Sequence, residues 1–136
     1  MRTLLFAFLL LATTAFAHHT DTDVRDELTG QWVGTSICTE PRGACHDETA
    51  SYRFTKHADD EHKVTASMNK IVNGEEEVMG ITEFTVDAKA RTIVADYQSR
   101  RGLIRWSFSW KGKEMTGTLI NVADGRVLRN IAVKRQ

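Results

Sequence analysis

The chain has 136 residues, in which 18 Lys and Arg are balanced by 18 Asp and Glu, so its formal net charge at pH 7 is zero. Nucleic-acid binding is driven by clustered Lys and Arg that contact phosphates and release their counterions. A neutral chain of this length therefore points to one domain with its own core and away from a nucleic-acid-binding protein.

Residues 1–17 have the pattern of a secretory signal peptide. A positive charge at Arg2 is followed by an apolar core at residues 4–11 and by the small-residue cleavage site Ala15-Phe16-Ala17. The apolar run is too short to span a bilayer. We therefore expect an exported protein, secreted or periplasmic, with no membrane span, whose mature chain of residues 18–136 forms a single domain.

Residues 21–28 carry Asp residues that suit helix caps, and we expect one helical turn there. From there to the C-terminus, nearly every segment alternates polar and apolar residues, is rich in β-branched and aromatic residues, and is broken by Gly, Asn or Asp. These are the signals of strands joined by hairpins. They predict eight strands, at residues 29–37, 49–56, 63–72, 76–86, 92–99, 103–110, 114–122 and 126–135.

Three short loops predict how neighbouring strands pair. Asn73-Gly74 is the strongest hairpin signal, because a type I′ turn needs positive φ at both central positions. The pairs expected across that loop are Met68 with Met79, Ala66 with Ile81, and Lys70 with Glu77. Loops at Lys111-Gly112 and at residues 123–125 predict the pairs Trp106 with Gly117, Phe108 with Met115, Leu119 with Arg129, and Gly117 with Ile131.

One possible pairing concerns charged residues. Glu83 and Asp96 become cross-strand neighbours if the turn at residues 88–91 is regular, and Arg105 is then the cation that offsets their repulsion. The favoured alternative is a bulge near Gly80 that shifts the register and places these charges in water.

Short loops force sequential strands to lie side by side and antiparallel, because parallel strands need long crossovers. Eight such strands, each with one apolar face, form either a meander that closes on itself or two stacked sheets. Closure removes both sheet edges, and a Greek-key sandwich would need long connections. The expected fold is therefore all-β, an up-and-down antiparallel barrel of about eight strands.

Cys38 and Cys45 are the only cysteines, and they flank the first loop of a chain that we expect to be exported. The favoured interpretation is a disulfide between them. The alternative, a metal site that adds His46, lacks the close cysteine spacing of zinc sites, so no metal is expected. The five histidines lie in the tail or in predicted loops, where haem or metal binding is the alternative to simple exposure; they are His18, His19, His46, His57 and His62.

Gly30-Gln31-Trp32 on the first strand, Arg129 on the last and the meander of hairpins resemble the calycin superfamily of lipocalins, fatty-acid-binding proteins and avidins. The nearest resemblance is to a small exported lipocalin-like barrel. It implies that Trp32 packs beneath Arg129 and that the two close one end of the barrel. The N-terminal strand also resembles the periplasmic metalloprotease inhibitors of the same fold, in which the segment before the barrel, here residues 18–25, enters the protease cleft.

Seven apolar side chains are expected to face the lumen: Tyr52, Phe54, Met68, Met79, Tyr97, Trp106 and Phe108. In a barrel of this size they either fill the interior or leave room for one small ligand. No nucleophile and base pairing, nucleophile elbow or phosphate loop is evident, so we expect neither an enzyme nor a cofactor. The expected function is binding of a small apolar or amphipathic ligand. The alternative is a protein-binding inhibitor that acts through residues 18–25 and the rim loops.

Overall fold

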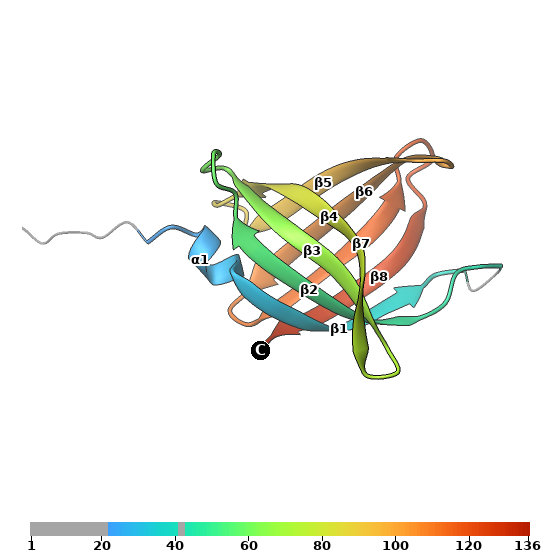
Figure 1. The fold of residues 1–136 in the computed structure, drawn as a ribbon. Helices are drawn as coiled ribbons and strands as arrows, with labels where there is room; N and C mark the ends of the chain where they lie inside the picture. The colour runs from blue at the N-terminus through green and yellow to red at the C-terminus, as the bar shows by residue number, and fades with distance from the viewer. Residues whose placement is uncertain (1–21, 41–42) are drawn as a thin grey trace, which may run out of the picture.

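The computed structural model describes residues 22–40 and 43–136. It contains one helical turn, as expected before the first strand, and eight strands (Figure 1). These elements are α1 (Arg25–Leu28), β1 (Gly30–Cys38), β2 (Glu48–Lys56), β3 (Lys63–Val72), β4 (Glu75–Asp87), β5 (Thr92–Ser99), β6 (Gly102–Lys111), β7 (Glu114–Asn121) and β8 (Val127–Arg135). Each predicted strand is present, and no strand end is displaced by more than one residue. The predicted signal peptide and the pair His18-His19 lie outside the described residues.

Each strand pairs antiparallel with the next, and β8 pairs with β1, so the sheet closes into a barrel. The predicted all-β, up-and-down architecture is confirmed. In Figure 1, α1 lies at one end of the barrel, and the hairpins β3–β4 and β5–β6 splay apart at the other. We call these the closed end and the open end. In the described part of the chain, no helix is long and apolar enough to cross a membrane.

The β3–β4 hairpin has the expected turn but not all of the expected register. Asn73 and Gly74 both have positive φ, 51° and 81°, as a type I′ turn requires. Lys70 lies opposite Glu77 as predicted. The register then shifts at a β-bulge, so the other two expected pairs are wrong. Met68 lies opposite Gly80 and Ala66 opposite Thr82, because the bulge leaves Met79 as an extra residue on β4.

The β6–β7 pairing differs from the prediction by two residues. The loop is Gly112-Lys113, so the observed pairs are Phe108 with Gly117 and Trp106 with Leu119. A slip of two residues keeps every side chain on the same face, and apolar alternation therefore does not reveal it. The predicted β7–β8 pairs, Leu119 with Arg129 and Gly117 with Ile131, are confirmed.

β4 and β5 pair only at their closed-end tips, from Thr85 and Val94 to Asp87 and Thr92. Beyond Val94 the ladder continues on β6 but not on β4. Glu83 and Asp96 therefore do not face each other as a pair. The Glu83 carboxylate contacts His57 at 3.1 Å and Lys63 at 3.6 Å, whereas Asp96 receives Arg105 at 2.6 Å. These charges lie on the outside of the barrel, as the favoured alternative expected.

The closed end is packed with large apolar side chains. Trp32 is fully buried, and its indole Nε1 donates a hydrogen bond to the Leu28 carbonyl oxygen at 2.8 Å. The expected contact with Arg129 is wrong, because Arg135 lies opposite Trp32 while Arg129 lies opposite Cys38. Six residues of strand separate the two positions by about 20 Å. Antiparallel pairing brings the end of the last strand, not its beginning, to the start of the first.

The predicted disulfide is confirmed: Cys38 and Cys45 are bonded across the β1–β2 loop. The same loop is held to the start of β8, because Thr39 donates hydrogen bonds to Leu128 and Val127 carbonyl oxygens at 3.2 and 2.6 Å. The described part of this loop is therefore fixed as one side of the open end.

Candidate ligand site at the open end of the barrel

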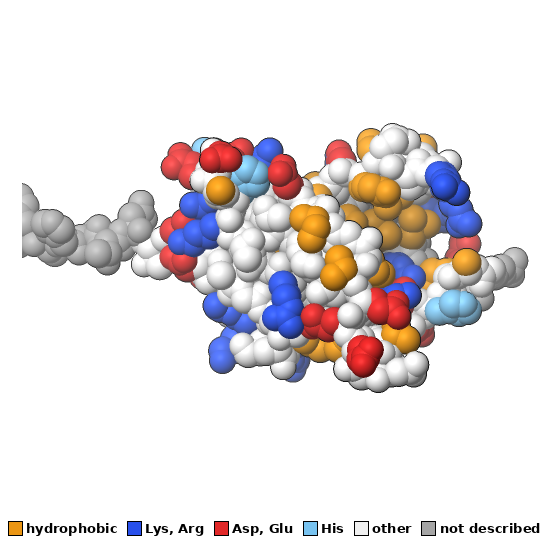
Figure 2. Space-filling view, in the orientation of Figure 1, with side chains coloured by type: hydrophobic (Ala, Val, Ile, Leu, Met, Phe, Trp, Pro, Cys, Tyr) orange, Lys and Arg blue, Asp and Glu red, His pale blue; other side chains and the backbone are white. Residues whose placement is uncertain are grey.

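A pocket of about 340 Å³ opens at the end of the barrel opposite α1. Figure 2 shows hydrophobic side chains gathered in a hollow there, with charged side chains around its edge. Most of its wall is apolar, and the apolar side chains are Met68, Met79, Ile81, Tyr97, Ile104, Trp106 and Leu119. The pocket therefore combines apolar surface with access from solvent, which is the usual character of a small-molecule site.

The pocket exists because β4 and β5 separate. Past the last pair, Thr85 with Val94, no strand of the described residues fills the space between β4 and β5, so their open-end halves form two walls of the pocket. Gly80 widens it further. A Cβ at Gly80 would meet no atom within 4 Å, so its missing side chain leaves open space in the wall.

The floor of the pocket is a packed aromatic cluster. Trp106 stacks on Phe108 with ring centroids 6.0 Å apart and planes 8° from parallel. Tyr52 meets both rings edge-on, at centroid distances of 6.3 and 5.9 Å. Below this cluster, Phe84 contacts Phe54 and Phe108 at 5.8 Å. Side chains thus fill the barrel from the closed end up to Trp106 and leave it open above.

The seven predicted lumen residues divide into three groups by their depth in the barrel. Tyr52, Phe54 and Phe108 are in the packed core, with 1% or less of their surface exposed. Met68 and Trp106 line the floor of the pocket. Met79 and Tyr97 line its rim and are 45% and 58% exposed. The two alternatives for the lumen, filled or open, therefore each describe one half of the barrel.

Arg129 supplies a polar wall of the pocket that sequence reasoning missed. Its Nη1 donates to the His46 carbonyl oxygen at 3.1 Å and to Ser36 at 3.3 Å, and its Nη2 donates to Glu48 at 3.4 Å. The sequence did carry a signal for this position. The predicted pairing of Leu119 with Arg129 puts both on one face of the sheet, and Leu119 belongs to the apolar face.

Tyr52 lies below this polar wall. Burial raises the pKa of Tyr52 to about 12, and a hydrogen bond with Ser36 partly opposes the effect. The phenol is therefore a neutral hydrogen-bonding group at any physiological pH. The pocket thus has an apolar floor and, on one side, a group of polar side chains.

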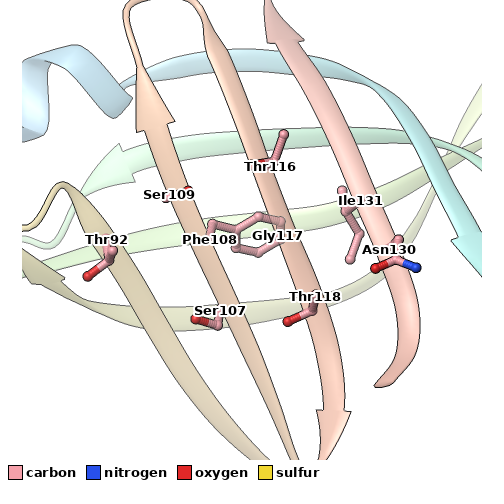
Figure 3. A pocket seen from close by; sticks show the side chains of 9 residues that line it. All are labelled: Thr92, Ser107, Phe108, Ser109, Thr116, Gly117, Thr118, Asn130 and Ile131. Carbon is pink, nitrogen blue, oxygen red and sulfur yellow. The ribbon is translucent and has the colours of Figure 1, made fainter. Parts of the chain in front are cut away.

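A larger depression of about 420 Å³ lies outside the barrel, over β6 and β7. Gly117 lies in its wall, and Figure 3 shows the Phe108 ring next to Gly117. The other side chains around it are mainly hydroxyls and one amide: Thr92, Ser107, Ser109, Thr116, Thr118 and Asn130. This surface is open and polar, so the pocket at the open end is the better candidate for an apolar ligand.

The described part of the predicted inhibitory segment, residues 22–25, is attached to the closed end. Arg25 forms an ion pair with Asp23 at 2.7 Å and donates to the Asp60 carbonyl oxygen at 3.0 Å. Lys56 joins Asp23 and Asp26 at 3.3 and 2.5 Å. Residues 18–21 lie outside the described part. The described part of the segment therefore lies at the end of the barrel away from the pocket.

Within residues 22–40 and 43–136, no group of three or more His, Cys, Asp or Glu is arranged to hold a metal ion. No protein-family model matches the chain, and no curated protein sequence matches it. What the barrel does must therefore be inferred from its own geometry. That geometry suits the reversible binding of a molecule that has an apolar part.

Proposed function

We propose that this protein is an exported binding protein that takes a small apolar or amphipathic molecule into the open end of its barrel. The observation that carries the proposal is the pocket above Trp106, which is walled mostly by apolar side chains and reaches solvent. At about 340 Å³ it lies within the range of roughly 300–1,000 Å³ typical of small-molecule sites.

Two features support export and the lipocalin-like interpretation. The predicted signal peptide at residues 1–17 and the disulfide between Cys38 and Cys45 both suit an oxidising compartment outside the cytoplasm. The closed meander of eight strands agrees with the resemblance to small lipocalin-like barrels of the calycin superfamily. Fold alone does not assign a function, so the proposal is based mainly on the pocket.

The proposed role is binding without chemical conversion. Arg129 and Glu48, the charged residues of the pocket wall, form an ion pair with each other at 3.4 Å. A molecule in the pocket would contact mainly methyl, thioether and aromatic groups. The space between β4 and β5 supplies the way in, since apolar rim residues flank it on both sides.

Protein binding is the second candidate, and exposed apolar residues near the rim favour it. Val78 and Ile81 on β4 are each 66% exposed, and Tyr97 on β5 lines the same pocket as Ile81. Large exposed apolar side chains gathered in one place often mark an interaction surface. An inhibitor of this kind would use residues 18–25 and the rim loops, not the inside of the barrel.

Uptake of a neutral apolar fluorophore, N-phenyl-1-naphthylamine, tests the proposal. We expect saturable binding with enhanced probe emission, because the pocket removes the probe from water. Gly80→Leu should abolish uptake, since Gly80 lies opposite the inward-facing Met68 and has open space where its side chain would grow.

Thr116→Leu is the matched control, because it adds the same side chain to the outer surface and should leave uptake unchanged. If the wild-type protein takes up no probe, or if both variants bind it equally, the pocket is not a ligand site. Protein binding then becomes the leading candidate.

A further inference from the structure

Three arginines gather beside the apolar pocket. A second depression of about 250 Å³ adjoins it and shares Leu119 and Arg129 as lining residues. Arg101, from the turn between β5 and β6, and Arg126, just before β8, complete this cationic side. The two depressions therefore lie side by side, one walled mainly by apolar side chains and the other containing three arginines.

Arg126 and Arg129 have longer ion-pair contacts than Arg105 has. Arg126 contacts Glu40 at 3.6 Å and Asp124 at 3.8 Å, and Arg129 contacts Glu48 at 3.4 Å. By contrast, Arg105 meets Asp96 in a two-point contact at 2.6 and 2.8 Å.

Arg101 has even fewer contacts. No ion pair or side-chain hydrogen bond joins its guanidinium to another residue within 22–40 and 43–136, and only its backbone nitrogen is bonded, to Ser99. Arg101 and Arg126 therefore have N–H groups that can donate hydrogen bonds to a ligand, although Glu40, Glu48 and Asp124 lie nearby.

From this arrangement we infer that the preferred ligand is a single-chain anionic amphiphile. This inference rests on the proposed function and specifies its ligand. The hydrocarbon chain occupies the pocket above Trp106, and the anionic head group, a carboxylate, phosphate or sulfate, lies against Arg101, Arg126 and Arg129. Planar guanidinium groups suit such heads because they donate two parallel hydrogen bonds to the oxygens of a carboxylate or phosphate.

Charge at the rim also orients the ligand. The opposite side of the open end is the β3–β4 hairpin, whose β4 strand begins with Glu75, Glu76 and Glu77. Glu76 and Glu77 are paired there with Arg53 and Lys70, so those two cations are already occupied, whereas Arg101 and Arg126 attract an anionic head. The ligand is therefore expected to bind with its head toward β8 and the β5–β6 turn.

The test compares probes that share one twelve-carbon chain and differ in the head group. Dodecyl phosphate, dodecyl maltoside and dodecyltrimethylammonium are titrated calorimetrically below their micelle concentrations, and inorganic phosphate is titrated separately. For the wild-type protein we expect dodecyl phosphate to bind about tenfold more tightly than the neutral maltoside, as new charge-assisted hydrogen bonds would produce. The cationic probe should bind most weakly, and inorganic phosphate should not bind measurably.

Substitution separates the head-group site from the pocket. In Arg101→Gln/Arg126→Gln the preference for the phosphate head should fall to about twofold or less, while dodecyl maltoside binds as before. Lys111→Gln/Lys113→Gln removes the same charge at the closed end and should keep the full preference.

Four results would overturn the inference. If the wild type binds the neutral and anionic probes equally, or if the arginine variant keeps its preference, the arginines do not select the ligand, and apolar binding alone survives. If inorganic phosphate binds as tightly as dodecyl phosphate, the arginines form a separate anion site. If no amphiphile binds, the proposed function fails together with the inference.

Discussion

Gly34 lies where the first strand meets the last, and the close approach there leaves no room for a side chain. A Cβ at this position would lie 2.0 Å from the Ala132 carbonyl oxygen and 2.7 Å from the Val133 Cα. Both are backbone atoms that cannot rotate away. We therefore expect Gly34→Ala to lower the free energy of unfolding by at least ~1–3 kcal/mol, as overpacking does.

Urea denaturation monitored by Trp fluorescence measures this effect. Gly80→Ala is the control, because its Cβ would have open space on the same barrel, and a change below about 1 kcal/mol is expected. Equal losses in the two variants would show that the β1–β8 contact is less close than described.

Tyr52 makes a prediction about alkaline pH. Its pKa of about 12 in the folded protein exceeds the ordinary value of 10.0, because burial disfavours the phenolate. As pH rises, the Tyr52 phenol therefore loses its proton at a lower pH in the unfolded chain than in the folded protein. The contribution of Tyr52 to stability is complete below pH 10.0 and is lost as pH rises through about 12.

The chain has two tyrosines, so Tyr97→Phe leaves Tyr52 as the only phenol. Absorbance of the phenolate near the ultraviolet tyrosinate maximum should then titrate with a midpoint close to 12. A midpoint near 10.0 in folded protein would mean that Tyr52 is reached by solvent, and that the core beneath the pocket is not packed.

For single residues, burial was easier to predict than the identity of the residue on the neighbouring strand. An aromatic side chain on the first strand was expected in the core, and Trp32 is fully buried there. The residue that it contacts was not foreseen, because the motif identifies residue types on the first and last strands but not the positions at which those strands pair. Only the register of β1 with β8, which places Arg135 opposite Trp32, decides that.

Among the elements, the β3–β4 hairpin is connected to the strands beside it through one carboxylate, that of Glu76. Glu76 accepts hydrogen bonds from Ser51 at 2.5 Å, from Gln31 at 2.8 Å and from Arg53 at 3.1 Å. Those three residues belong to β1 and β2, so Glu76 ties the hairpin to the neighbouring strands. The hydrogen bond from Ser51 is the main reason that the pKa of Glu76 lies below its usual value, and contact with Arg53 lowers it further.

A lowered carboxylate pKa has a defined effect on acid stability. The stabilisation by Glu76 is present above its unfolded pKa of 4.5 and is lost as pH falls through the lower folded value. Urea unfolding measured between neutral and acid pH should therefore show a smaller loss of stability in Glu76→Gln than in the wild type.

Glu77→Gln provides the comparison, because the ion pair of Glu77 among the described residues is with Lys70 on the hairpin itself, at 3.5 Å. It should keep the acid dependence of the wild type. The same slope in all three proteins would show that Glu76 does not hold the hairpin.

Sequence reasoning located the elements well but missed where their pairing breaks. The Asn73-Gly74 turn fixed the β3–β4 register as far as Asn69, since turn type and loop length set pairing locally. The bulge at Met79 and the separation of β4 from β5 beyond Val94 depend on how the closed sheet curves. No local pattern in the chain reports that curvature, and these two features create the pocket.

For the molecule as a whole, the order of hairpins was enough to predict closure. Alternation also placed most of the core and pocket-floor side chains on the inner face, namely Tyr52, Phe54, Met68, Trp106 and Phe108. It did not show how far along the barrel each one lies, because a period of two assigns a face and not a height. The contrast between a packed closed end and an open apolar pocket therefore emerged only from the structure, and this contrast is the basis of the proposed function.

The three tryptophans report on both ends of the barrel at once. Trp106 lies in the pocket, whereas Trp32 and Trp110 are buried near the closed end, bonded to Leu28 and Glu27. Protein labelled with ¹⁵N at its indoles should give three signals that can be followed during titration with N-phenyl-1-naphthylamine. We predict that the Trp106 signal shifts in a saturable way while the other two stay in place. Movement of all three together, or of none, would contradict binding at the open end.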